Sequence, residues 1–131
     1  MNRLTLQLFR GRSVAQYRHL PIYKATYDLL TQVTQITRSY PKDFKHSLAA
    51  RLRDESVSLV VFIYKANASK SKRREWIESI LERIQVIELL LRLSKDMRFI
   101  SVKQLSDTVV LTDSIGRQAQ GWMKSQKLSA E

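Results

Sequence analysis

The sequence predicts an all-α protein, folded as an antiparallel up-down-up-down four-helix bundle. The chain of 131 residues contains three glycines and two prolines, too few for the frequent tight turns of a β-rich fold. Four amphipathic segments with apolar residues at steps of three and four follow one another, separated by three short breaks. Because short connections force consecutive helices to lie antiparallel, these segments are expected to form one bundle in a single domain.

The first helix is expected to begin at Leu20-Pro21, because proline suits the first turn, where its missing N–H is not needed. The break at residues 40–43 ends this helix, since Pro41 disfavours a helical backbone at the residue before it. Asp43 is the expected N-cap of the next helix. The apolar face of the first helix consists of Ile22, Thr26, Leu29, Val33, Ile36 and Tyr40.

The second helix is predicted over Phe44–Ala68. From Val57 to Tyr64 nearly every residue is apolar, and the segment is rich in residues that favour β-strands. A buried strand is therefore the alternative interpretation of this segment. The helical pattern continues on both sides of it without a turn residue, which favours a helix.

The third helix is predicted over Lys72–Met97, after a break at residues 67–71. Ser101 and Gln104 have the spacing of a capping box and mark the start of the fourth helix. The fourth helix is expected to fade near Gly121 or after Met123. We assign the bundle to residues 20–127 and a polar tail to residues 128–131.

Residues 1–19 contain four arginines and no acidic residue, and they are predicted to form a flexible basic arm. The alternatives are an organelle transit peptide and an arm that touches phosphates; the short apolar stretch disfavours a secretory signal. No apolar run approaches the roughly 20 residues of a membrane span. The chain has no cysteine, so disulfides and thiolate metal sites are excluded. We expect a cytoplasmic protein with no membrane partner.

Charge is the strongest functional signal: 23 Lys+Arg against 12 Asp+Glu give a formal net charge of +11. A polyanion such as RNA or DNA would relieve the resulting self-repulsion. The cluster Lys70–Arg74 lies at the start of the third helix, where backbone N–H groups also attract phosphate. The alternative is a solvated cluster offset by Glu75 and Glu78. The predicted nucleic-acid-binding residues, most of them expected at one end of the bundle, are Lys65, Lys70, Lys72, Arg73, Arg74, Arg117, Lys124 and Lys127.

No sequence-reading module is present, because the helices are too long for a helix-turn-helix and the aromatic motifs of RNA-recognition domains are absent. Binding is therefore expected to be dominated by phosphates, weakly sequence-specific and strongly dependent on salt.

The apolar surfaces of the second and third helices are wider than one bundle core requires, which indicates a homo-oligomer. The alternative is that these two helices are central and covered within the monomer. The predicted oligomer-interface residues are Val57, Val61, Tyr64, Leu89, Leu90 and Leu93.

Residues for catalysis are scarce, and we expect no enzyme, no cofactor and no metal. His19 and His46 are expected on the surface, without the acidic neighbours of a metal site. The carboxylates at positions 75, 78 and 82 are expected to pair with Arg74 and Arg83. The two glutamates within apolar stripes, at positions 55 and 88, need partners, for which Arg51 and Arg92 are the candidates, across helices or an oligomer interface. An enzyme or nucleotide-handling subunit is the poorly supported alternative.

Three segments resemble one known family: Leu20–Lys24 (LPIYK), Tyr40–Lys42 (YPK) and above all Ile115–Lys124 (IGRQAQGWMK). They are similar to the accessory variability determinant (Avd) proteins of diversity-generating retroelements. These proteins are related to four-helix-bundle proteins encoded in intervening sequences of bacterial large-subunit rRNA genes. The resemblance covers about Leu20 to Lys127 and rests on element lengths and the C-terminal pattern.

The resemblance implies a basic homopentamer that binds nucleic acid and partners the reverse transcriptase of the element. Such a protein would support mutagenic copying of template RNA, and the family has no catalytic residues to carry over. The alternative that it leaves open is an intervening-sequence type of bundle protein, which binds nucleic acid without a reverse-transcriptase partner.

Overall fold

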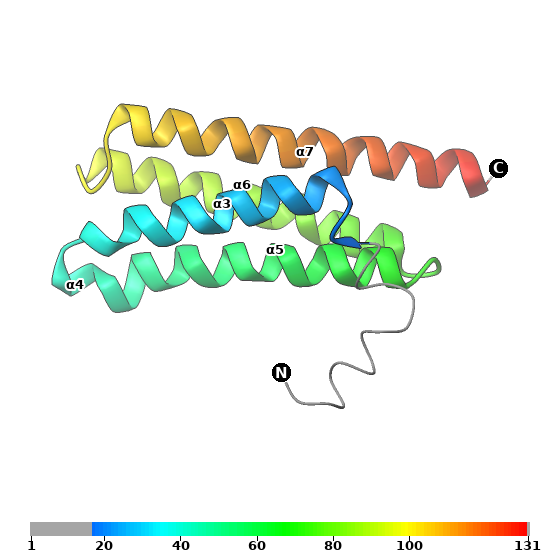
Figure 1. The fold of residues 1–131 in the computed structure, drawn as a ribbon, viewed down its shortest axis with the longest axis horizontal. Coiled ribbons are helices and arrows are strands. Elements are labelled where there is room, and N and C mark those ends of the chain that lie inside the picture. Colours follow the sequence, from blue (N-terminus) through cyan, green and yellow to red (C-terminus); the bar gives the residue numbers. More distant parts are fainter. Residues whose placement is uncertain (1–16, 131) are drawn as a thin grey trace.

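The computed structural model describes residues 17–130, with side chains up to residue 126. Most of the predicted N-terminal arm lies outside the described residues. Figure 1 shows four long helices: α3 (Pro21–Ile36), α5 (Ala50–Ala68), α6 (Arg73–Asp96) and α7 (Val102–Ala130). The described residues contain no strand, so the predicted all-α class is confirmed. The strand alternative for residues 57–64 is wrong, because α5 runs through them.

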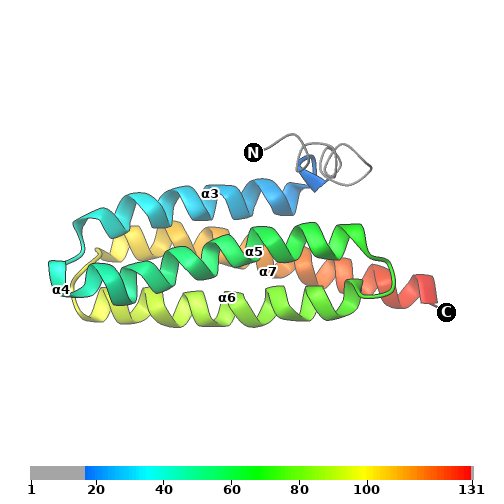
Figure 2. The ribbon, with the colours of Figure 1, turned by 90° about the horizontal axis from the view of Figure 1, so that it is seen from below.

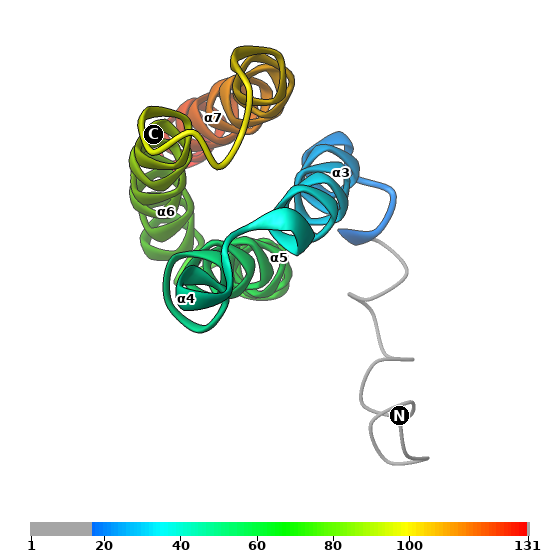
Figure 3. The same ribbon diagram turned by 90° about the vertical axis from the view of Figure 1, so that its left-hand side faces the viewer.

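The helices form a closed ring of neighbours, in which α3 packs on α5, α5 on α6, α6 on α7 and α7 on α3. Figures 2 and 3 show this arrangement from below and along the bundle. Each neighbouring pair is antiparallel, which confirms the predicted up-down-up-down bundle. One end of the bundle, here called the α5–α6 end, holds the loop between α5 and α6 together with the start of α3 and the end of α7.

The core consists of the apolar faces that the three-four spacing predicts. Its fully buried side chains include Leu29, Val33, Leu52, Leu59, Ile63, Ile77, Ile80, Ile87, Leu91 and Ile115. Removing such side chains from water is the main contribution to folding.

Hydroxyl groups also lie within this core. Thr26, Ser56 and Ser94 are buried, and each donates a hydrogen bond to the carbonyl oxygen four residues earlier, at 2.7, 2.8 and 2.8 Å. Burying a hydroxyl is tolerated here because the helix itself supplies an acceptor.

The connection between α3 and α5 is more irregular than predicted. A 3-10 turn (Thr37–Ser39) is followed by the short α4 (Lys42–Phe44) and a π-helical segment (Lys45–Ala49), which continues into α5. Asp43 is not an N-cap, because the extended backbone of Pro41 already takes that position and places Asp43 inside the first turn. Its carboxylate still opposes the positive end of the helix dipole. Arg53 braces the connection by donating to the Thr37 hydroxyl at 3.3 Å and to the Lys45 carbonyl at 3.4 Å.

The start of α7 is as predicted, whereas its end is not. Ser101 N–H donates to the Gln104 side chain at 2.9 Å, and Gln104 N–H donates to the Ser101 hydroxyl at 3.0 Å, which confirms the capping box. The helix does not fade near Gly121 but continues to Ala130, beyond the ends of the other helices (Figure 1). Met123 is buried and Trp122 packs against the core, so tertiary contacts carry the helix past the glycine.

An aromatic cluster fills the opposite end of the bundle. The rings of Tyr40 and Phe44 lie 5.3 and 4.7 Å from that of Phe99. Tyr40 is only 2% exposed, and no hydrogen bond of normal geometry satisfies its hydroxyl. Burial raises the pKa of Tyr40 above 10.0, and Ser94 only partly opposes this rise.

The sign of this shift predicts a loss of stability at alkaline pH. Tyr40 ionises more readily in the unfolded chain than in the folded one. The contribution of its protonated form to the free energy of unfolding is therefore complete below pH 10 and is lost as the pH rises further. We expect Tyr40→Phe to raise the free energy of unfolding by about 1 kcal/mol at pH 7, since it removes an unsatisfied buried hydroxyl. The advantage should be larger at pH 10.5. Urea unfolding at both pH values measures the gain in the free energy of unfolding, with substitution of the exposed Tyr27 by Phe as the control. An equal gain for Tyr40→Phe at both pH values would contradict the prediction.

Within residues 17–130, no helix is both long and apolar enough to cross a membrane.

Candidate nucleic-acid interface

The bundle topology brings most of the predicted nucleic-acid-binding residues to the α5–α6 end. Lys65 lies in the last turn of α5, Lys70 in the loop, and Lys72 just before α6. Arg73 and Arg74 form the first turn of α6, and Lys124 lies near the end of α7. Arg117 lies about two turns farther from this end on α7. Lys127 belongs to the α7 backbone, but its side chain is outside the described part of the chain.

Some of these cations are held by the protein itself. Arg73 donates from Nε to the Ala66 carbonyl at 2.7 Å and from Nη2 to the Asn67 carbonyl at 3.1 Å, and its guanidinium lies 5.8 Å from the Trp122 ring. It therefore satisfies carbonyl groups that the end of α5 leaves unpaired. This structural role depends on the α5–α6 hairpin, and no local sequence pattern signals it.

Lys65 and Arg74 are also engaged, although both remain exposed. The Lys65 ammonium lies 4.5 Å from the centre of the Trp76 ring, and that ring stacks on Phe62. Arg74 pairs with Glu78 at 3.4 Å, one turn along α6, as predicted. Exposed contacts of this kind are weak enough for a phosphate to compete with them.

The remaining cations have no partner among the described residues: Lys70, Lys72, Arg117 and Lys124. Lys70 and Lys72 are exposed beside the N-terminus of α6, where the helix dipole is positive. Glu78 is occupied by Arg74, and Glu75 makes no ion pair in the described structure. Positive charge at this end is therefore only partly offset within the chain.

Cations are not confined to this end. Arg38, Lys42, Lys45 and Arg98 are exposed at the opposite end. Three aspartates, Asp43, Asp54 and Asp96, lie on the segments that meet there. The cations of the opposite end therefore have aspartates nearby. A binding experiment has to compare the two ends of the bundle.

The buried glutamate of α5 has its partners within the protomer. Glu55, whose side chain is 9% exposed, accepts hydrogen bonds from Arg51 at 2.9 Å and from Arg83 of α6 at 3.1 Å. This confirms an inter-helix salt bridge, with Arg83 as the unforeseen partner. Arg83 also donates to Glu82, and these two carboxylates raise the pKa of the Arg83 guanidinium. Glu88 bonds the Thr112 hydroxyl at 2.9 Å and not an arginine.

Four of the six predicted oligomer-interface residues lie in exposed apolar patches, one on α5 and one on α6. Val57 and Val61 are exposed on α5, with Val57 at 47%, and Leu89 and Leu93 are exposed on α6, with Leu89 at 66%. The idea that these residues are covered within the monomer is wrong for these four. Tyr64 and Leu90 are half-buried. Four further large apolar residues are exposed that were not among the predicted interface residues: Tyr27, Met97, Val102 and Val110.

His19 and His46 are both exposed, as predicted. Among residues 17–126, no group of three or more histidine, aspartate or glutamate side chains is arranged to hold a metal ion.

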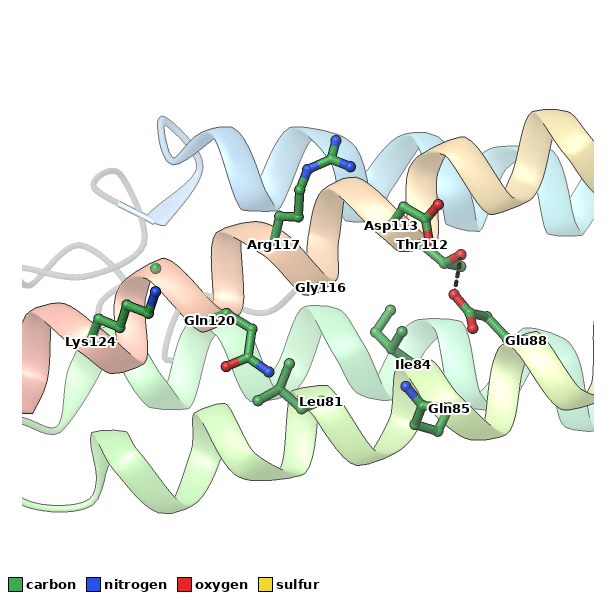
Figure 4. A pocket seen from close by; sticks show the side chains of 11 residues that line it. Leu81, Ile84, Gln85, Glu88, Thr112, Asp113, Gly116, Arg117, Gln120 and Lys124 are labelled. Atoms are coloured by element: carbon green, nitrogen blue, oxygen red, sulfur yellow. Dashed lines mark hydrogen bonds between the residues drawn. The ribbon is translucent and has the colours of Figure 1, made fainter.

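A groove lies between α6 and α7, along the side of the bundle (Figure 4). It has a volume of about 510 Å³ and reaches Lys124 near the α5–α6 end. Gln120 extends from α7 toward Leu81 on α6, and the Glu88–Thr112 hydrogen bond lies toward the other end of the groove (Figure 4).

Comparison with protein-family models matches residues 20–126 to the family described as bAvd-like. No curated protein matches the chain.

Proposed function

The chain belongs to the bAvd-like family, and on this premise we propose that it is a non-enzymatic accessory protein of a diversity-generating retroelement. In this proposal it binds nucleic acid in the cytoplasm and assists the element's reverse transcriptase in mutagenic copying of template RNA. The observation that carries the binding part is the group of exposed, unpartnered lysines at the α5–α6 end: Lys70, Lys72 and Lys124.

These lysines suit phosphate recognition rather than base recognition. An ammonium group on a flexible stem acts as a point charge, without the rigid fork by which arginine reads a guanine edge. Neutralising phosphates releases counterions, so affinity would fall steeply with salt and vary little with sequence.

Homo-oligomerisation is part of the same proposal. The exposed patches on α5 and α6 are the surfaces that a second copy would cover, because large apolar side chains gain most from burial. The resemblance to Avd proteins implies five copies. In such an assembly the α5–α6 end would occur once per protomer, which multiplies weak phosphate contacts into avid binding.

The test is co-purification of the chain with the reverse transcriptase and template RNA encoded beside it, at about 50 mM salt. We expect both to be retained and the RNA to be released first as salt increases. Retention of RNA without the reverse transcriptase would favour the intervening-sequence type of bundle protein. Failure to retain either would refute the proposal, and native mass spectrometry of the same sample gives the number of copies.

A further inference from the structure

The groove between α6 and α7 has features that packing of the chain does not explain. Its α7 wall includes two glycines, Gly116 and Gly121, in the interior of a long helix. A Cβ atom added at either position would meet no atom within 4 Å. The fold itself therefore does not require glycine there, although each glycine costs about 1 kcal/mol relative to alanine in a helix interior. Their effect is to keep the α7 backbone open toward the groove.

The polar groups of the groove are arranged in order along it. Lys124 lies at the mouth near the α5–α6 end, followed by the amides of Gln120 and Gln85. None of these three side chains has a partner among the described residues. Arg117, also without a partner, extends from the rim away from α6 (Figure 4).

Acidic groups mark the other end of the groove. Glu88 is held there by its hydrogen bond to Thr112, and the exposed Asp113 lies beside it on α7. A polyanion would be attracted at the mouth, hydrogen-bonded by neutral amides along the groove and repelled at the far end.

From these observations we propose that the groove holds the phosphodiester backbone of an unpaired nucleic-acid strand, leading away from the lysines of the α5–α6 end. Glu88 and Asp113 mark where the strand leaves the groove. This inference rests on the proposed function, which it deepens by naming the strand type and its path.

The dimensions favour a single strand over a duplex. The groove has a volume of about 510 Å³, within the range of clefts that hold one small ligand, so it admits a short stretch of one strand but no double helix. The seven helical steps from Arg117 to Lys124 span about 10 Å, which matches about three nucleotides of a stacked strand. A second protein copy fits less well, because the exposed apolar side chains that it would cover lie outside the groove.

The test fills the groove without changing charge. We expect the double variant Gly116→Leu, Gly121→Leu to bind a single-stranded RNA 12-mer about tenfold more weakly, as for one or two lost phosphate contacts. A duplex of the same length should bind as before, through the α5–α6 end. The matched control, Gly116→Ala with Gly121→Ala, adds only Cβ atoms and should retain single-strand affinity. Fluorescence anisotropy measures the affinities of the unaltered chain and of both variants for each RNA.

Equal single-strand affinity of the leucine and alanine variants would overturn the inference, as would a loss shared equally by the duplex. A changed oligomeric mass of the leucine variant would show that the groove is a protein interface, and would also overturn it. If the unaltered chain binds neither RNA, the proposed function fails instead.

A second variant protects the test against misfolding of the leucine variant. Asp113 is exposed and has no partner among the described residues, so Asp113→Asn should leave the fold intact. It should strengthen single-strand binding severalfold and leave duplex binding unchanged. Unchanged single-strand affinity would contradict the proposed exit of the strand.

Discussion

Alanine at Lys70, Lys72 and Lys124 together is expected to weaken binding of single-stranded RNA about 100-fold at 0.1 M salt. Each lysine that contacts one phosphate of a single strand contributes about 0.7 to the salt slope, or a factor of about 5 at this salt concentration. The slope of log K against log salt should therefore fall by about 2. Titrations followed by anisotropy at four salt concentrations measure both quantities.

The matched control removes the same net charge from the opposite end. Lys42, Lys45 and Lys103 are exposed there, so their replacement by alanine also lowers the formal charge by three. We expect this variant to lose less than threefold in affinity, because acidic neighbours already offset that end, among them Asp107, which pairs with Lys103 at 3.3 Å. Equal losses in the two variants would mean that total charge governs binding and that the α5–α6 end is not the interface.

Arg73 is left out of the triple alanine variant of the α5–α6 end for a structural reason. It closes the end of α5 through the Ala66 and Asn67 carbonyls, so alanine at this position would weaken the hairpin and RNA binding together. A loss of affinity in such a variant would not locate the interface.

The largest expected effect on stability follows from the buried carboxylate of Glu55. Arg83→Met keeps most of the apolar stem but removes the charge that pairs with Glu55 across the α5–α6 interface. We expect the free energy of unfolding to fall by about 3 kcal/mol, the low end for breaking a buried ion pair, because Arg51 still contacts Glu55. Urea unfolding monitored by circular dichroism measures the change.

Glu82→Gln is the control for this prediction. Arg83 pairs with Glu82 as well, but the Glu82 side chain is 69% exposed, and exposed pairs contribute little. Loss of the Arg83–Glu82 pair should lower the free energy of unfolding by less than about 0.5 kcal/mol. If the two variants were destabilised equally, the stability would come from the surface pair and not from Glu55.

Local signals in the sequence were sufficient for much of the fold. The apolar spacing located the four helices, and the capping box formed between residues only three positions apart. Asp43 was misassigned because Pro41, with its extended backbone, takes the N-cap position two residues earlier. The end of α7 was misplaced because the burial of Met123 outweighs the low helix propensity of Gly121.

The site was less predictable, because its contacts join residues that are distant in sequence. Glu55 was recognisable as a charge needing a partner, but Arg83 lies 28 residues away and was not among the predicted partners, Arg51 and Arg92. The Glu88–Thr112 bond and the cation–π contact of Arg73 with Trp122 likewise depend on how helices pack. The α6–α7 groove has no sequence signature beyond two helical glycines.

The inward-turned hydroxyls of the core have a mechanical consequence. Thr26 and Ser56 bond only within their own helices, so they do not resist a one-turn slip of about 5.4 Å between neighbours. Resistance to sliding comes instead from contacts that cross between helices, and α6 makes such contacts on both sides, to Glu55 of α5 and to Thr112 of α7. The helix α6 thereby fixes the positions of α5 and α7 along the bundle axis. The position of α3 along this axis depends instead on the shape of its apolar side chains.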